Sequence, residues 1–163
     1  MNRPQIQKRE RVDYSKRDNI ERLVVHWKTQ CALAYRRDGF FLQRFFMVPS
    51  DGFGCYLLIN ESGLDKDDFV ELAVEQLRKT PCRALLHVAV AWSSEEAVRR
   101  QVPPSQCADK KRILFACFEE QGQMARGWFA ELGVDPPTVG DWSDETSRVA
   151  GVFTGILYAK EPS

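Results

Sequence analysis

The hydrophobic and polar positions of this chain of 163 residues follow a helical period in some stretches and a strand pattern in others. Apolar side chains recur at helical spacing over 20–34 and 69–77, with charged residues between them. Continuous apolar runs fill 84–92 and 113–118, separated by a polar segment that contains Pro103 and Pro104. Runs of this kind predict strands that are buried on both faces. The two patterns together predict a covered sheet with amphipathic helices.

Both helices end in residue types that favour a helix end. Arg36 and Arg37 suit the negative carboxyl end of the first helix, and Gly39 can take the left-handed conformation that follows. An acidic group at 65–68 begins the second helix, which Pro81 closes. The stretch 94–100 is a candidate for a third, short helix, although its apolar periodicity is brief.

The strand stretches set the fold class. They cover 40–48, 53–59, 84–92, 113–118, 124–132 and 147–158. Short links between neighbours favour antiparallel pairing. We therefore expect an α+β fold, in the order α-β-β-α-β-β-β-(β), with an antiparallel sheet of five to six strands and two main helices packed on one face. Residues 1–14 are expected to form a mobile basic tail, followed by a single α+β domain over 15–163.

Composition narrows the class of protein. With 44% hydrophobic and 28% charged residues, the chain matches folded globular proteins. No apolar run approaches the roughly 18 residues of a membrane span, and the first 15 residues lack the apolar middle of a secretory signal. The five cysteines are odd in number and widely spaced, which favours reduced thiols. We expect a cytoplasmic protein without a membrane partner.

Charge is unevenly placed although the formal net charge is zero. Residues 1–37 carry ten basic and four acidic side chains. A basic arm of this kind can hold phosphate backbones, although the pI of 6.7 lies below the value of about 9 that is usual for nucleic-acid-binding domains. A solvated tail leading into a charged helix explains the same pattern. The candidate nucleic-acid contacts are Lys8, Arg9, Arg11, Lys16 and Arg17.

Candidate catalytic residues are few. His87 lies inside an apolar run, where it is either a neutral core histidine or a base whose ring reaches a cleft. Cys107 lies in a polar loop beside Lys110 and Lys111, whose charge favours a thiolate. A thiol or hydrolytic enzyme would need Cys107 and His87 close in space. Without that pairing we expect no catalytic residues.

Motifs for cofactors and metals are missing from the sequence. There is no Cys-x-x-Cys pair to begin a zinc site and no glycine-rich phosphate loop. The sequence therefore predicts neither a cofactor nor a metal.

Aromatic and basic residues alternate over 35–47. Alternation places aromatic side chains on both faces of the predicted strand. Three interpretations stay open: core packing on both faces, a surface for a protein partner or a second copy, and a platform for single-stranded nucleic acid. The interface candidates are Phe41, Arg44, Phe45, Arg36 and Arg37.

Val90-Ala-Trp92, at the end of a predicted strand, and the loop 104–110 that follows it form a pattern that resembles a family of small uncharacterised bacterial and phage proteins. In that family a strand ending in Glu-Ala-Trp leads through a loop of the type Pro-Ser-Glu-His-Pro-Asp-Arg into the next strand. Here the corresponding pieces are Val90-Ala-Trp92 and Pro104-Ser-Gln-Cys-Ala-Asp-Lys110. The resemblance covers the chain from about residue 84 onward. It implies an α+β fold and a bacterial or mobile-element setting.

The leading hypothesis is a non-enzymatic binding protein that acts through a protein–protein interface, as a small adaptor or inhibitor encoded by a phage or mobile element. Its partner is an unidentified protein or a second copy of the chain. Nucleic-acid binding by the basic arm and first helix, and thiol or hydrolytic chemistry by Cys107 and His87, are the two alternatives.

Overall fold

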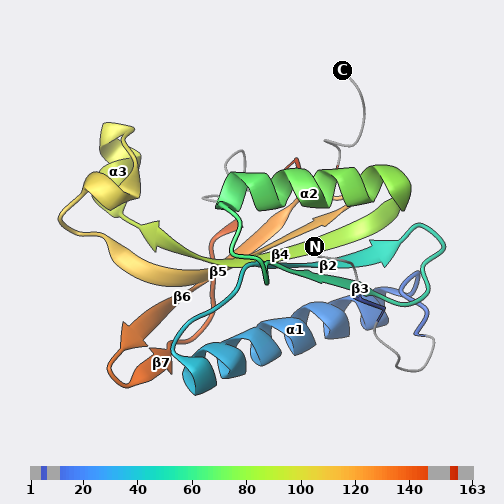
Figure 1. The fold of residues 1–163 in the computed structure, drawn as a ribbon, viewed down its shortest axis with the longest axis horizontal. Helices are drawn as coiled ribbons and strands as arrows, with labels where there is room; N and C mark the ends of the chain where they lie inside the picture. Colours follow the sequence, from blue (N-terminus) through green and yellow to red (C-terminus); the bar gives the residue numbers. More distant parts are fainter. Residues whose placement is uncertain (1–4, 7–11, 147–154, 158–163) are drawn as a thin grey trace.

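A curved antiparallel sheet lies between two long helices in the computed structural model, which describes residues 5–6, 12–146 and 155–157 (Figure 1). Helix α1 (Arg17–Asp38) packs against one face of the sheet and helix α2 (Lys66–Lys79) against the other. The α+β class and the antiparallel sheet are confirmed. The expectation that both helices share one face is wrong.

Within the described residues, eight strands form the sheet, and five of them have four residues or more. In chain order they are β1 (Gln5–Ile6), β2 (Arg44–Pro49), β3 (Tyr56–Ile59), β4 (Cys82–Ser93), β5 (Lys111–Glu120), β6 (Arg126–Val134), β7 (Pro137–Val139) and β8 (Ser143–Asp144). Their order across the sheet is β1-β3-β2-β4-β5-β6-β7, and β8 pairs with β6. Strands β1, β7 and β8 are too short to leave an apolar pattern, which is why the sequence predicts fewer strands.

The placement of the helices follows from the two apolar faces of the central strands. Phe46 and Leu86 belong to the core cluster under α1, whereas their neighbours Phe45 and Leu85 belong to the cluster under α2. Neighbouring residues of a strand point to opposite faces, so an uninterrupted apolar run needs a cover on each side. A single helical layer would leave one face of β4 exposed to water.

The amino-terminal residues that the structure describes do not form a free tail. Gln5 and Ile6 pair with β3, and Asp13 forms a bridge to Phe53. Residues 1–4 and 7–11 lie outside the described part. Most of the strand expected over 147–158 also lies outside it, and the described residues 155–157 form a turn.

Strands β4 and β5 extend beyond the other strands and carry the short helix α3 (Glu95–Arg100) and the 3-10 turn η1 (Pro104–Gln106) between them (Figure 1). The hydroxyl of Ser94 accepts a hydrogen bond of 3.0 Å from the backbone N–H of Ala97, which caps α3. This cap confirms the short helix expected over 94–100. Among the described helices, none is both long enough and apolar enough to cross a membrane.

Candidate functional site

A groove of about 890 Å³ lies where the end of β4 meets α3 and the start of α2. We call it the α3 groove. Its apolar lining includes Val90, Trp92, Ala97, Val98, Val102 and Pro104. Residues from both faces of β4 line it, because Val90 and Trp92 point to one face of the strand while Ala91 points to the other. The hollow therefore surrounds the edge of this strand.

Two large apolar side chains of the groove are exposed. Trp92 is 41% exposed and Val98 is 65% exposed. The indole of Trp92 has the Lys110 ammonium 5.0 Å and the Arg112 guanidinium 5.6 Å from its ring centre. Contacts of a cation with the ring face favour the observed ring orientation. The groove thus presents a positioned aromatic side chain to solvent.

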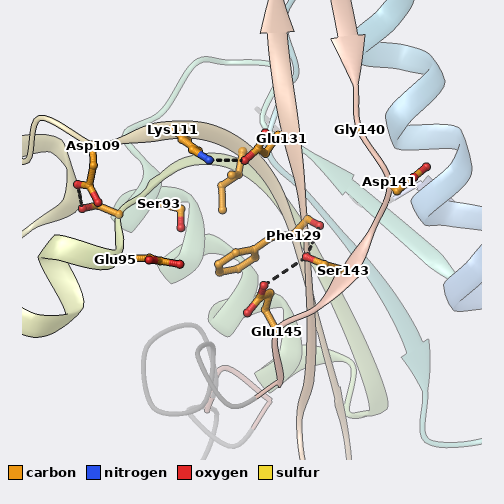
Figure 2. A pocket seen from close by; sticks show the side chains of 12 residues that line it. Ser93, Glu95, Asp109, Lys111, Phe129, Glu131, Gly140, Asp141, Ser143 and Glu145 are labelled. Atoms are coloured by element: carbon orange, nitrogen blue, oxygen red, sulfur yellow. Dashed lines mark hydrogen bonds and ion pairs between the residues drawn. The ribbon is translucent and has the colours of Figure 1, made fainter.

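A second hollow, of about 620 Å³, adjoins the first and is rich in carboxylates. We call it the acidic pocket. Its acidic residues are Glu95, Asp109, Glu131, Asp141 and Glu145. Lys111 is the one basic residue in its described lining, and it pairs with Glu131 at 3.0 Å. In Figure 2 the ring of Phe129 lies amid these side chains, between Glu95, Glu145 and the Lys111–Glu131 pair.

The two hollows adjoin each other, and we call them together the cleft. Ser93, Ser94, Ile113 and Phe129 line both of them. The charged residues in the described lining of the α3 groove are both basic, Lys66 and Arg112, whereas carboxylates dominate the acidic pocket. The α3 groove is therefore mainly apolar with two basic residues, and the adjoining pocket is acidic.

Asp109 holds α3 in place. Its carboxylate accepts a short hydrogen bond from the Ser94 hydroxyl and another, of 3.1 Å, from the backbone N–H of Glu96. These hydrogen bonds lower the pKa of Asp109. The carboxylate is therefore ionised at neutral pH and completes the amino-terminal cap of α3.

A group of metal-ligand residue types also occurs at this helix. One ligand atom each of Glu96, Cys107 and Asp109 lies within 4.8 Å of the others. The carboxylates already have partners, since Glu96 pairs with Arg100 at 3.0 Å and Asp109 caps the helix. Helix capping and an intrahelical ion pair account for the group without an ion.

The structure does not bring the predicted thiol and imidazole together. Cys107 is buried beside α3, and its thiol lies 3.9 Å from the carbonyl oxygen of Pro103. Cys107 lies near Asp109, which accepts a hydrogen bond from Ser94 just after the end of β4. His87 lies six residues before Ser93, the last residue of β4, which is about 20 Å along the strand. This separation contradicts the arrangement that a Cys107–His87 enzyme requires.

His87 is a neutral core histidine. It is fully enclosed, with its ring stacked on Phe45 at 4.3 Å and edge-on to Phe115 at 5.1 Å. Its Nε2 lies 2.8 Å from the side-chain amide nitrogen of Gln43. Burial, with a smaller contribution from the Lys66 charge, lowers the pKa of His87 to about 3. The ring is uncharged at neutral pH and does not line either hollow.

The aromatic interface candidates mostly belong to the core. Phe45 is fully buried between His87 and Phe69, so the prediction of an exposed interface residue is wrong for it. Phe41 is half-buried, and the guanidinium of Arg44 lies 4.2 Å from its ring centre. Core packing on both faces is the interpretation that the structure supports for this strand.

The remaining interface candidates, Arg36 and Arg37, are exposed at the end of α1. Arg36 donates a hydrogen bond of 3.1 Å to the carbonyl oxygen of Val139, and Arg37 pairs with Asp38 at 2.8 Å. They do not line the cleft.

The nucleic-acid candidates fall partly outside the described residues. Lys8, Arg9 and Arg11 lie in an undescribed segment. Lys16 is exposed before α1, and Arg17 pairs with Glu120 at 2.7 Å and with Glu21 at 3.5 Å. The charge of Arg17 is thus compensated by acidic neighbours.

A scan against protein-family models, a search of curated proteins and a search of solved structures each returned no match. The function is therefore inferred from the geometry of the chain.

The cleft itself was not predicted from the sequence, although two signals pointed near it. Trp92 ends an apolar run, and Pro103-Pro104 interrupts the polar segment that follows. The exposure of Trp92 depends on where the pairing of β2 with β4 ends, and the local sequence pattern does not predict this point.

Proposed function

We propose that this protein binds a partner protein through the α3 groove and acts without catalysis of its own. The observation that carries the proposal is the exposure of Trp92 and Val98 in one apolar hollow. Exposed apolar surface of this kind marks interaction sites, and tryptophan is among the residues that contribute most to protein interfaces.

The lining of the cleft favours binding over catalysis. Neither of the two histidines lines it. The serines of its described lining, Ser93, Ser94, Ser105 and Ser143, therefore have no imidazole beside them in the cleft to act as a base. A hollow that follows a strand edge also suits a segment of a partner protein better than a small molecule, which a deep pocket encloses.

We further propose a cytoplasmic setting for this interaction. All five cysteines are free thiols, and burial raises the pKa of three of them, Cys31, Cys55 and Cys117, to about 12. Buried free thiols are typical of proteins from reducing compartments. The resemblance of the second half to small bacterial and phage proteins suits a bacterial or mobile-element setting, in which we propose that the chain acts as a small adaptor or inhibitor.

Selection from a displayed library of random peptides tests the groove without knowledge of the natural partner. The chain serves as bait in its wild-type form and as the Val98→Glu variant, which places a charge in the groove. We expect enriched peptides with apolar side chains whose affinity falls by at least about tenfold for Val98→Glu.

Val25→Glu is the matched control, because Val25 lies on α1, outside the lining of the cleft, and is 60% exposed. Peptide binding should be the same for this variant and the wild type. An absence of enriched peptides, or peptides that bind Val98→Glu as tightly as the wild type, would overturn the proposed function.

A further inference from the structure

Part of β4 is an open sheet edge within the α3 groove. Strand β2 pairs with β4 from Cys82 to Val88, and the described residues give no strand partner on that side of β4 from Ala89 to Ser93. On its other side β4 stays paired with β5 as far as Ser93. Residues 89–92 of β4 are therefore paired with a strand on one side only.

The backbone groups that face this edge follow from the register. The N–H of Gln121, just after β5, donates to the carbonyl oxygen of Arg83, and the register that pairs Ala84 with Glu120 places these two residues opposite each other. In an antiparallel pair, hydrogen-bonded residues alternate along the strand. The odd-numbered residues of β4 thus direct their backbone groups to β5, and the even-numbered ones direct theirs to the opposite side.

The same alternation appears in the neighbouring pair. The N–H of Asn60 donates to the carbonyl oxygen of Gln43, so the even-numbered residues of β2 face β4. Val90 and Trp92 consequently direct their N–H and C=O groups to the open edge. The carbonyl oxygen of Val90 accepts a hydrogen bond of 3.1 Å from Lys66 Nζ, as this geometry requires.

Three backbone hydrogen-bonding groups at this edge remain available to a ligand. They are the N–H of Val90 and both the N–H and the C=O of Trp92, for which no backbone partner occurs in the part of the chain that the structure describes. An edge with unpaired groups is a template for another strand. The apolar side chains of the groove lie beside it.

We propose that the partner binds by strand addition: an extended segment of the partner protein pairs with Val90–Trp92 and places alternate side chains in the α3 groove. The inference rests on the proposed function and specifies its binding mode. Backbone hydrogen bonds to β4 supply affinity, and the groove around Trp92 and Val98 selects apolar side chains at alternate positions.

The charge of the acidic pocket predicts which residue types the partner segment carries at one end. The open edge of β4 begins at Val90, beside the Lys66 ammonium, and leads to Ser93 and the following Ser94, which both line the acidic pocket. Five carboxylates and one ammonium line that pocket. A segment with lysine or arginine at the end over Ser94 complements it, and a segment with glutamate there is repelled.

Amide hydrogen exchange measured by NMR tests the strand addition directly. The probe is the tightest-binding peptide from the library selection, in synthetic form. In the free protein the amides of Val90 and Trp92 should exchange faster than those of Ala89 and Ala91, which face β5. The peptide should slow the exchange of Val90 and Trp92 by at least about tenfold. Unchanged exchange of these two amides in the complex would overturn strand addition.

Backbone variants provide a second readout. Val90→Pro removes the outward N–H, and an edge strand tolerates proline there, whereas Val90→Ala shortens the side chain and keeps the N–H. The proline variant should bind the peptide about tenfold more weakly than the alanine variant. Urea unfolding checks that both are folded. If Val90→Pro does not fold, N-methylation of the peptide at alternate positions replaces it, and a loss of about tenfold is expected at every second position only.

The outcomes separate the two proposals. Peptides that depend on Val98 but leave the Val90 and Trp92 amides unprotected would support the groove and contradict strand addition. A shift to twice the molecular mass in light scattering, with the same amides protected in the absence of peptide, would assign the edge to a second copy and overturn the partner segment. An unchanged affinity after replacement of the basic residues at the end of the peptide by glutamate would contradict the predicted role of the acidic pocket.

Discussion

The side-chain Nε2 atoms of Gln43, just before β2, and His87, on β4, lie 2.8 Å apart, and both side chains are buried. An amide nitrogen only donates, so the imidazole Nε2 accepts and the ring proton lies on Nδ1. This Nδ1 has no hydrogen-bond partner among the described residues. The pair thus fixes the tautomer of His87 inside the core, away from the lining of the cleft.

A double-mutant cycle tests this pair. Gln43→Leu and His87→Leu each leave a buried polar partner without its hydrogen bond, so each should lower the free energy of unfolding by about 1–3 kcal/mol. The double variant should lose less than the sum of the two by about 1 kcal/mol. Urea unfolding at pH 7 measures all three variants. Strictly additive losses would show that the two side chains do not interact.

The pH dependence of stability follows from the lowered pKa of His87. An unfolded chain binds a proton at His87 near pH 6.5, whereas burial lowers the pKa of the folded state to about 3. Between these values the unfolded state binds more protons, so the free energy of unfolding falls as the pH drops. The expected slope is about 1.4 kcal/mol per pH unit below pH 6.

The Gln43→Leu/His87→Leu double variant isolates this contribution, because it retains every other titrating group of the wild type. Urea unfolding at pH 7, 6 and 5 should show a steeper loss for the wild type than for the double variant. Parallel curves would mean that His87 titrates normally in the folded state.

Removal of the Asp109 carboxylate should loosen α3. Asp109→Ala deletes the hydrogen bonds from Ser94 and Glu96, so the amide of Ala97, which donates to Ser94, should exchange about tenfold faster. Peptide affinity should fall as well, because α3 carries Val98. Asp141→Ala is the control, since Asp141 lines the same pocket without a hydrogen bond to α3. Equal exchange of Ala97 in both variants would contradict the capping role.

Glu119 should matter for stability although it lies far from the cleft. Its buried carboxylate accepts hydrogen bonds from the backbone N–H groups of Gly155 and Leu157, and Leu157 packs into the core under α2. Glu119→Ala should therefore lower the free energy of unfolding by about 1–3 kcal/mol. Glu131→Ala, at an exposed ion pair, should cost less than about 1 kcal/mol. The two losses are compared by urea unfolding, and equal losses would contradict the assignment.

Local patterns were sufficient to predict the main elements of the fold. The helical spacing over 20–34 predicts most of α1, and the apolar runs over 84–92 and 113–118 predict the centres of β4 and β5. These signals are local, because the spacing of apolar residues within one short segment can be seen without knowledge of the rest of the fold. The predicted helix end also holds, since Gly39 takes a left-handed conformation with φ 75°.

The candidate site could not be predicted because it depends on where pairing ends. β2 pairs with β4 only as far as Val88, and this limit leaves Val90 and Trp92 at an open edge. The sequence shows an uninterrupted apolar run through that point. The burial of Phe45 and the distance between Cys107 and His87 likewise follow from tertiary packing, which assigns α1 and α2 to opposite faces.

Amide hydrogen–deuterium exchange of the whole chain, with and without the selected peptide, tests the central claim most directly. If the α3 groove is the binding surface, protection should include residues 89–105 and 109–113 and should be confined to the segments that line the groove and the acidic pocket. Protection of residues 16–38 or 40–47, or no protection at all, would contradict the account.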